Sequence, residues 1–532
     1  MMIGTRSLTG FTEGNGLEEY ILTVDQGTTS TKAFLLNKDG DLIKSRPVPV
    51  SQHYPAPGFV EHDAVEIYLS VLKTMADVLI HNPEAVINGI AITNQRETTI
   101  AFNKISGIPY CNAIVWQCRR TAEICRREVY ASRQKDISAI TGLKLDPYFS
   151  ATKMRWIMEN VPGTEKAALS GELLFGTVDS YLVYMITGKK SFLTDYSNSS
   201  RTMLFDITKL EYSDELLKLF DIPRKALPAP KPSCADYGEV CFDRQDLIKL
   251  GMSEEETDAL LRLNGVHINA VAGDQAAALF GQTCFEKGSA KTTYGTGCFT
   301  LMNIGDKPQF SDNGLLTSAA WSYEGKTVYA LEGSVFQGGS VITWLKDALG
   351  LIDKPSDCDD LCRSIKDNGG VYLVPAFSGL GAPYWNPDLR GTITGLTGGT
   401  GRAHIVRAAV ESIAYQVTEL VDLMMSDTGI TSTHMRVDGG VCACEFLMQL
   451  QADLLGVTIT RARSDEMTAT GVGMLAGLTS GFYSSTDEIK TLYKPSNVYK
   501  PMRSSYSARV LLNEYKRAVA ASVTASKSGG IN

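Results

Sequence analysis

The feature that most constrains the fold of this chain is an apolar stretch that runs into a glycine turn carrying acidic or hydroxyl side chains. The pattern occurs at residues 21–32, 291–302 and 435–440, so both halves of the chain contain it. Each copy predicts a short β-strand followed by a turn with accessible backbone N–H groups. One such turn is weak evidence, because many strand–helix junctions resemble it. Three copies predict a nucleotide held in a cleft between two related α/β domains, each of which supplies one phosphate loop.

The first copy, Ile21 to Lys32, predicts a β-hairpin with an anion site at its tip. The tip offers backbone N–H groups and the side chains of Thr28, Thr29, Ser30 and Lys32. The carboxylate of Asp25 lies beside these donors and suits the Mg²⁺ ion that accompanies a nucleotide triphosphate. An ordinary polar hairpin turn is an equally good interpretation of this stretch alone.

The chain is too long for a single hydrophobic core. A length of 532 residues predicts at least two domains. Short strands that alternate with helices indicate the α/β class. We expect a flexible tail at residues 1–18, an N-terminal domain at 19–283 and a C-terminal domain at 284–525.

Composition excludes several classes of protein. The formal net charge of -8 argues against a nucleic-acid partner. We expect no membrane span, because no apolar run is long enough to cross a bilayer. The polar N-terminus lacks a signal core, so a cytoplasmic location is expected. The 11 cysteines form no C-x-x-C pair and the 6 histidines are scattered, which favours neither a disulfide scaffold nor a zinc site.

A further predicted strand, residues 268–273, ends at Asp274 and Gln275, just before an alanine-rich helix. The carboxylate of Asp274 has two interpretations. It could cap the N-terminus of the helix, or it could act as a general base. The residues alone favour the cap.

Several motifs together resemble the FGGY family of carbohydrate kinases over residues 20–520. Two fit the general family patterns, at 148–156 and 391–411. Others are more specific to the members that phosphorylate glycerol, at 92–99, 112–119, 176–179, 199–205 and 374–385. The resemblance implies two actin-like (ribonuclease-H-like) domains with the active site in the cleft between them. It also implies transfer of a phosphoryl group from ATP to glycerol, with a role in glycerol uptake and catabolism.

The resemblance implies a role for each residue of the polyol site. Asp274 becomes the general base, in a direct in-line transfer without a phosphoenzyme. Hydroxyls of glycerol would meet polar side chains, and two aromatic rings would cover its carbon edge. The residues concerned are Arg96, Glu97, Tyr148, Asp274 and Gln275, with Trp116 and Phe299 as the rings. The alternatives are a surface ion pair for Arg96 and Glu97, and ordinary core packing for the two rings.

For ATP, the resemblance implies that Asp25 holds Mg²⁺ through water. The β- and γ-phosphates would meet Thr28, Thr29, Ser30 and Lys32, with Gly295 and Thr296 in the second phosphate loop. Further nucleotide contacts are implied for Gly339, Thr343, Gly440 and Cys444.

Three positions depart from the family pattern. Lys32 stands where many relatives have Arg, and Thr343 where many have Gln. Cys444 stands where bacterial relatives have an Asn that contacts adenine, which predicts weaker selection among purine nucleotides. The acidic segment Asp243 to Asn264 replaces the loop through which some bacterial members respond to fructose 1,6-bisphosphate. We therefore expect no such regulation.

Three other functions fit parts of the sequence. They are an FGGY kinase acting on a pentulose, a nucleotide-dependent chaperone-like protein and a non-catalytic scaffold. The pair Arg96 and Glu97 with Trp116 favours the smaller substrate, and the presence of both Asp25 and Asp274 argues against a scaffold. The resemblance also implies a homodimer or homotetramer.

Overall fold

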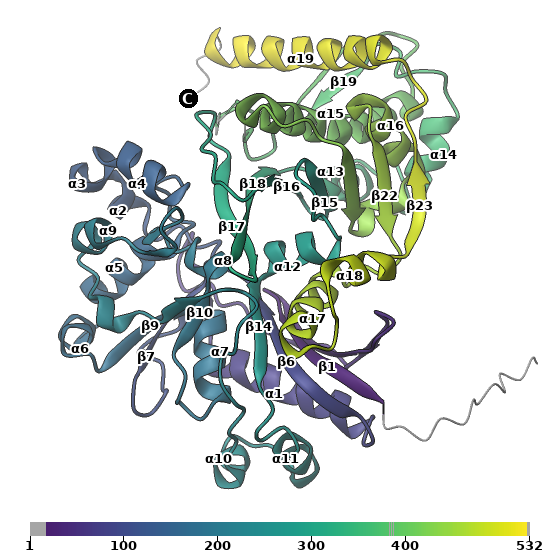
Figure 1. The fold of residues 1–532 in the computed structure, drawn as a ribbon. Helices are drawn as coiled ribbons and strands as arrows, with labels where there is room; N and C mark the ends of the chain where they lie inside the picture. The colour runs from purple at the N-terminus through teal and green to yellow at the C-terminus, as the bar shows by residue number, and fades with distance from the viewer. Residues whose placement is uncertain (1–17, 382, 385, 387, 529–532) are drawn as a thin grey trace, which may run out of the picture.

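The computed structural model describes residues 18–381, 383, 384, 386 and 388–528. All but the last residue of the tail expected at residues 1–18 lies outside the described residues. Two sheets with helices on their faces dominate the molecule, one in each half (Figure 1).

The N-terminal sheet has the strand order β14-β6-β1-β2-β3, and β4 pairs with β2. Strands β1 and β2 form the predicted hairpin, whose tip is closed by a hydrogen bond from the backbone N–H of Gly27 to the carbonyl of Ser30. Strand β6 pairs in parallel with β1, and β14 pairs in parallel with β6. The strands are β1 (Glu19–Gln26), β2 (Ser30–Leu36), β3 (Leu42–Lys44), β4 (Val48–Pro49), β6 (Val86–Asn94) and β14 (Ile268–Gly273).

The C-terminal sheet repeats this arrangement in the order β17-β18-β16-β15-β21-β22-β23. A hairpin, β15 and β16, is again extended by parallel strands beside its first member. The strands are β15 (Ser289–Tyr294), β16 (Cys298–Gly305), β17 (Leu316–Tyr323), β18 (Lys326–Val335), β21 (His434–Asp438), β22 (Thr458–Ala462) and β23 (Pro495–Tyr499). The shared five-strand order confirms the expected pair of ribonuclease-H-like α/β domains.

Two helices lie between the sheets, α12 (Asp274–Gly281) and α17 (Met467–Ser480) (Figure 1). Although α17 belongs to the C-terminal half of the sequence, it packs on β14, β6 and β1. The two helices cross closely at Gly281 and Gly471, because a Cβ atom on Gly471 would lie 1.9 Å from the carbonyl oxygen of Ala277. One apolar core joins both sheets and both helices.

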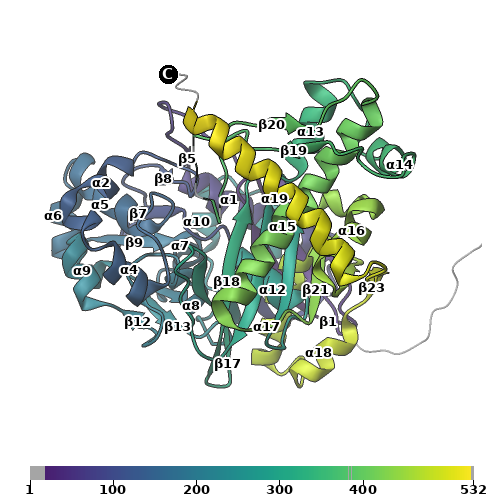
Figure 2. The ribbon, with the colours of Figure 1, turned by 90° about the horizontal axis from the view of Figure 1, so that it is seen from above.

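Other helices cover the outer faces. On the N-terminal side these are α1 (Ala64–Ile80) and α7 (Val178–Ile186), with α10 (Arg244–Lys249) and α11 (Glu254–Leu261) beyond α1. Helix α11 begins after Ser253, whose side chain forms a capping box with Glu256. On the C-terminal side these are α13 (Gly339–Asp347), α14 (Asp357–Arg363), α15 (Arg402–Thr428), α16 (Glu445–Leu455) and α19 (Ser505–Ser528), which lies across α15 (Figure 2).

A smaller sheet, in the order β5-β8-β7-β9, extends the N-terminal half. Its strands are β5 (Glu61–His62), β7 (Thr99–Asn103), β8 (Ala113–Ile114) and β9 (Leu173–Thr177). Helices of this extension are α2 (Ala122–Arg126), α3 (Glu128–Ala131), α4 (Gln134–Thr141), α5 (Ser150–Asn160), α6 (Thr164–Ser170) and α9 (Asp214–Phe220), and the short helix α8 (Tyr196–Ser199) packs against β14 and β17. This extension supplies Trp116, Tyr148 and Arg201 to the site described below.

Helix α18 (Thr486–Leu492) precedes β23. The remaining strands are short: β10 (Leu193–Asp195), β11 (Phe205–Asp206), β12 (Glu211–Tyr212), β13 (Ala229–Lys231), β19 (Tyr372–Val374) and β20 (Thr392–Thr394). Among the described residues no helix is long and apolar enough to cross a membrane. The domain boundary expected near residue 283 stays a prediction.

Candidate active site

Strand register brings the predicted site residues of the N-terminal half together. In the parallel strands, Asp25 lies opposite Thr93, and Gly273 lies opposite Asn94. The carboxyl ends of β1, β6 and β14 therefore meet at one edge of the sheet. That edge of the sheet carries Asp25, and the segment 95–97 and Asp274 lie just beyond it.

Asp274 does not cap its helix. The N-cap of α12 is Gly273 and makes no side-chain capping hydrogen bond. Instead, Oδ1 of Asp274 accepts a hydrogen bond of 2.7 Å from the backbone N–H of Gln275 and lies 3.3 Å from Nε of Arg96. The side chain keeps 34% of its surface accessible, unlike its buried neighbour Arg96. A carboxylate that is held in place and still reachable can take a proton from a bound hydroxyl.

Arg96 and Glu97 are buried, so the alternative of a surface ion pair is wrong. Nε of Arg96 lies 3.8 Å from Oε1 of Glu97, and its two terminal nitrogens bind Glu332 of β18 at 2.7 and 3.0 Å. Arg201 binds Oε1 of Glu97 at 2.6 Å and Oε1 of Glu332 at 3.2 Å. The two arginines and two glutamates form one ionic network that joins the halves of the molecule.

Two of the three aromatic residues predicted for the polyol, Trp116 and Tyr148, lie beside this network. The rings of Trp116 and Tyr148 meet edge to face with centroids 5.7 Å apart. The indole N–H of Trp116 donates to Oγ1 of Thr28 over 2.9 Å. The predicted polyol site therefore directly adjoins the predicted phosphate loop. Phe299 is half-buried and lies opposite Thr293 in the C-terminal sheet.

The pKa values of the acidic side chains depend on burial and on the charges of their neighbours. Burial raises the pKa of Asp25 to about 7, the negative charges of Asp274 and Glu466 add to this, and Lys32 opposes it. Burial also raises the pKa of Asp274, against the positive charges of Arg96 and Lys291. Asp25 and Asp274 thus belong to one electrostatic site, although they come from distant parts of the sequence.

Lys32, predicted to meet phosphate, is held by a carboxylate from the other half of the chain. Its Nζ lies 3.1 Å from both carboxylate oxygens of Glu466, which also pairs with Lys44. Attraction to these lysines lowers the pKa of Glu466 against the effect of burial. Around the same tip Thr29 is exposed, and Thr28 and Ser30 are half-buried.

The second phosphate loop, which contains Gly295, lies against two other glycine turns, one at Gly339 and one at Gly439 and Gly440. The backbone N–H of Gly339 donates to the carbonyl of Gly295 over 2.7 Å. Gly439 has φ 96°, and a Cβ atom there would lie 2.4 Å from the carbonyl oxygen of Tyr294. A Cβ atom on Gly440 would meet open space. The predicted contacts Gly295, Gly339 and Gly440 are therefore grouped around a common space, with Thr296 exposed beside them.

Two further predicted nucleotide contacts lie on nearby helices. Thr343 is exposed on α13. Cys444 is the N-cap of α16, with its thiol 3.7 Å from Oδ1 of Asp359. Burial raises the pKa of Cys444 to about 12, so the thiol is neutral.

Sequence reasoning missed four charged residues at this site: Arg201, Glu332, Lys291 and Lys153. Arg201 and Lys153 stand inside motifs that carry the family resemblance, but no role followed from those motifs. Glu332 and Lys291 are charged residues within buried strands, and this was the available signal. Nζ of Lys291 donates to Oε1 of Gln275 over 2.6 Å, and Nζ of Lys153 donates to the carbonyls of Glu97 and Tyr148.

The residues present fit a magnesium–nucleotide complex. No cluster of three His, Cys, Asp or Glu residues within the described ranges could hold a metal ion by itself. Mg²⁺ is usually held by one or two carboxylates together with water and the substrate phosphates. Asp25, whose pKa is raised beside the charge of Asp274, provides such a carboxylate next to the predicted phosphate loop.

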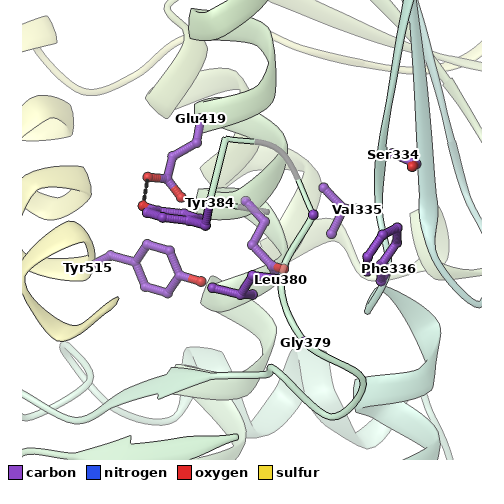
Figure 3. Close-up of a pocket in the computed structure, with 10 residues that line it drawn as sticks. Ser334, Val335, Phe336, Gly379, Leu380, Tyr384, Glu419 and Tyr515 are labelled. Carbon is purple, nitrogen blue, oxygen red and sulfur yellow. Dashed lines mark hydrogen bonds between the residues drawn. The ribbon is translucent and has the colours of Figure 1, made fainter. Parts of the chain in front are cut away.

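A separate crevice in the C-terminal half contains none of the predicted site residues (Figure 3). Tyr384 donates a hydrogen bond to Glu419 of α15, and Tyr515 of α19 lies beside them. Burial raises the pKa of Glu419 to about 7.

Comparison with known proteins agrees with this geometry. The model of the FGGY family of carbohydrate kinases matches with its N-terminal domain at residues 20–281 and its C-terminal domain at residues 290–480. The chain belongs to the FGGY family of carbohydrate kinases.

Relatives of similar length share one name. A glycerol kinase of Carboxydothermus hydrogenoformans is 47% identical over 506 residues, covering 94% of this chain and 98% of that protein. A glycerol kinase of Pseudomonas fluorescens is 44% identical over 94% of this chain and 96% of its own. The crystal structure of Plasmodium falciparum glycerol kinase with ADP has a TM-score of 0.89 and 34% identity, covering 95% of this chain and 98% of that one.

Proposed function

We propose that this chain catalyses the ATP-dependent phosphorylation of glycerol to sn-glycerol 3-phosphate, with Asp274 as the general base of a direct in-line transfer. The class of reaction follows from the family, and the substrate from relatives named glycerol kinase over nearly the whole chain. The observation that carries the assignment of residues is geometric. A single atom, Nε of Arg96, lies within 4 Å of both Asp274 and Glu97.

In this proposal a glycerol hydroxyl lies against Asp274, and the remaining hydroxyls meet Arg96 and Glu97. Two terminal N–H groups of Arg96 are left for substrate once Glu332 and Asp274 are bound. Oε2 of Glu97 accepts no hydrogen bond from the described residues, so it is available to a hydroxyl. Gln275 is fixed by Lys291 and would orient the reacting end.

Asp274 takes the proton of the attacking hydroxyl as the oxygen bonds to the γ-phosphorus. Trp116, Tyr148 and Phe299 would cover the carbon edge and keep water from the reacting phosphate. Exclusion of water is essential, because water would otherwise compete with the alcohol as acceptor.

For the nucleotide, Asp25 would hold Mg²⁺ through water beside the phosphates. Bound Mg²⁺ neutralises charge on the phosphate oxygens during transfer. Thr28, Thr29 and Ser30 would contact the β- and γ-phosphates. Lys32 would join them once it leaves Glu466, and Gly295, Thr296, Gly339 and Gly440 would line the other side.

The test is ADP release measured in a coupled assay, with glycerol, water alone and a pentulose as parallel acceptors. Release that depends on glycerol supports the proposal. Faster release with the pentulose would reassign the substrate, and release in water alone would indicate a nucleotide hydrolase. We further propose a cytoplasmic location and a homodimer or homotetramer. Light scattering of the purified full chain would test the oligomeric state.

A further inference from the structure

Helix α8 is one short turn, most of it buried, that lies against the edge of the N-terminal sheet. Strand β14 is the edge strand on that side. The backbone N–H of its last residue, Gly273, donates to Oγ of Ser197 in α8 over 2.8 Å. Because Gly273 is buried and directly precedes Asp274, this hydrogen bond fixes the backbone from which the proposed base extends.

The next residue of α8, Asn198, contacts the strand that leads to Arg96. The side-chain amides of Asn198 and Asn94 exchange two hydrogen bonds of 3.1 Å each. Asn94 is the last residue of β6 and lies opposite Gly273 in the parallel pair. Adjacent residues of α8 therefore hold the ends of β14 and β6, and these two strands lead to Asp274 and Arg96.

Asp195, the N-cap of α8, fixes the helix itself. Its buried carboxylate accepts hydrogen bonds from the backbone N–H groups of Ser197 and Asn198, at 2.9 and 2.8 Å. It also accepts from the side-chain amide of Asn198 and from the hydroxyl of Ser233, at 2.9 and 2.8 Å. A buried polar network in which every member is satisfied is rigid, so α8 is a firm support for the two strand ends.

The side chain of Arg96 passes directly over the backbone at Gly273. A Cβ atom at Gly273 would lie 2.6 Å from Cγ and 2.7 Å from Cδ of Arg96. Nε of Arg96 lies 3.3 Å from Oδ1 of Asp274. Because the packing is this close, a shift of β14 relative to β6 would change the distance between the guanidinium and the carboxylate.

We propose that Ser197 and Asn198 are positioning residues that set the placement of Asp274 relative to Arg96. Ser197 acts on the general base through the end of β14, and Asn198 acts on the arginine through the end of β6. Both side chains are buried, so neither contacts the substrate. The inference rests on the proposed function, because it names the support of the same site. A misplacement of about 1 Å at a reacting centre can cost about 10²-fold in rate.

The experiment compares the full-length wild type with two variants, Ser197→Ala and Asn198→Ala. Ser197→Ala removes the acceptor of the Gly273 N–H, and Asn198→Ala removes both hydrogen bonds to Asn94. Three quantities are measured: the rate of phosphoryl transfer in a single turnover, KM for glycerol and KM for ATP. Thermal unfolding of each variant is measured in parallel.

Thr187 provides the matched control. It is a buried residue after α7 whose hydroxyl also accepts a hydrogen bond from a backbone N–H, that of Ser191, over 3.2 Å. It lies in a crevice that contains none of the predicted site residues. Thr187→Val removes this acceptor at nearly constant volume. It should lower stability without changing the single-turnover rate or either KM.

Ser197→Ala should lower the single-turnover rate by about 10–100-fold, because the base is displaced. Asn198→Ala should raise KM for glycerol by about fivefold or more, the value of one hydrogen bond, because the arginine is displaced. KM for ATP should stay within about twofold in both variants, because the phosphate loops do not contact α8.

Folded variants with the wild-type rate and the wild-type KM for glycerol would overturn the inference. The same loss in Thr187→Val, or a rise in KM for ATP as large as the loss of rate, would also overturn it. If one variant does not fold, the other decides. Failure of both to fold would overturn the inference, because α8 would then be shown only to stabilise the fold. Absence of glycerol-dependent ADP release in the wild type would instead refute the proposed function.

Discussion

Both terminal nitrogens of Arg96 bind the carboxylate of Glu332, at 2.7 and 3.0 Å. Arg96 follows a strand of the N-terminal sheet, whereas Glu332 lies within β18 of the C-terminal sheet. The guanidinium proposed to bind glycerol is therefore oriented by the opposite half of the molecule.

Replacing Glu332 by Gln should raise KM for glycerol by about tenfold or more, because Arg96 and Arg201 lose their shared counter-charge. KM for ATP should change little. Steady-state kinetics with each substrate varied in turn would measure the difference. As a control, Glu411→Gln breaks a buried pair with Arg407, 2.8 Å long, away from the site and should leave KM for glycerol unchanged. Equal effects of the two variants on KM would contradict the prediction.

Replacing Asp274 by Asn should lower kcat by about 10²–10⁴-fold, the range for loss of a general base. Nucleotide affinity, measured by calorimetry, should stay close to that of the wild type. Because burial raises the pKa of Asp274, the wild-type rate should fall with decreasing pH at a pH above the ordinary value for an aspartate. Retained turnover in the variant would remove Asp274 from this role.

Replacing Lys153 by Met should weaken glycerol binding, because Lys153 holds the backbone of two residues proposed to contact glycerol. Nζ of Lys153 donates to the carbonyls of Glu97 and Tyr148 at 2.9 and 2.7 Å, and so fixes the two segments relative to each other. Loss of both hydrogen bonds should cost about 1–3 kcal/mol of unfolding free energy. Urea denaturation would measure this, and KM for glycerol should rise. A destabilised variant with an unchanged KM for glycerol would show that the two hydrogen bonds of Lys153 stabilise the fold but do not affect substrate binding.

Glu419 should make stability depend on pH. Its folded-state pKa, about 7, lies above the ordinary value of a glutamate because of burial and the nearby Asp422, although Lys516 and the hydrogen bond from Tyr384 act in the other direction. The protonated form is therefore the stabilising one. Its contribution is complete below the unfolded-state pKa, near 4.5, and is lost as pH rises through about 7.

Glu419→Gln keeps an acceptor for Tyr384 and carries no charge. At pH 8 it should be more stable than the wild type by up to roughly 3 kcal/mol, and near pH 4 the two should be alike. Thermal melts at both pH values would measure this. An advantage for the variant that is the same at both values would contradict the assignment.

Cys444→Asn should raise the selectivity for ATP over other purine triphosphates. The thiol is neutral and half-buried, and it makes only a weak contact with Asp359 in place of the amide expected in relatives. Other purine triphosphates should compete with ATP in the wild type. The variant should gain selectivity for ATP of about fivefold, the value of one ordinary hydrogen bond. Strict ATP preference in a wild-type competition assay would argue against this.

The repeated fold was predictable because its signals are local. The alternation of apolar strands with glycine turns at Gly27 and Gly295 follows from backbone geometry, and the structure places both turns at the ends of hairpins. The grouping of Asp25, Arg96 and Asp274 was implied by the family resemblance and not by local signals, because it depends on β1, β6 and β14 lying side by side in parallel.

The ionic partners were not predictable in this way. Glu332 reaches Arg96 across 236 residues of sequence, and Glu466 reaches Lys32 across 434. No period or motif links positions so far apart, because the contact exists only once both halves have folded. A lone charged residue in a buried strand signals that some partner exists but not which one.

The placement of α17 on the N-terminal sheet has a consequence for biosynthesis. The first sheet is complete in sequence once β14 has left the ribosome, yet the helix that covers most of one face, α17 (Met467–Ser480), is translated much later. Nearly two hundred residues of translation separate the two events. The nascent N-terminal half therefore exposes apolar surface during this part of translation. Its folding is complete only when α17, which is encoded near the 3′ end of the mRNA, has been synthesised and has packed on the sheet.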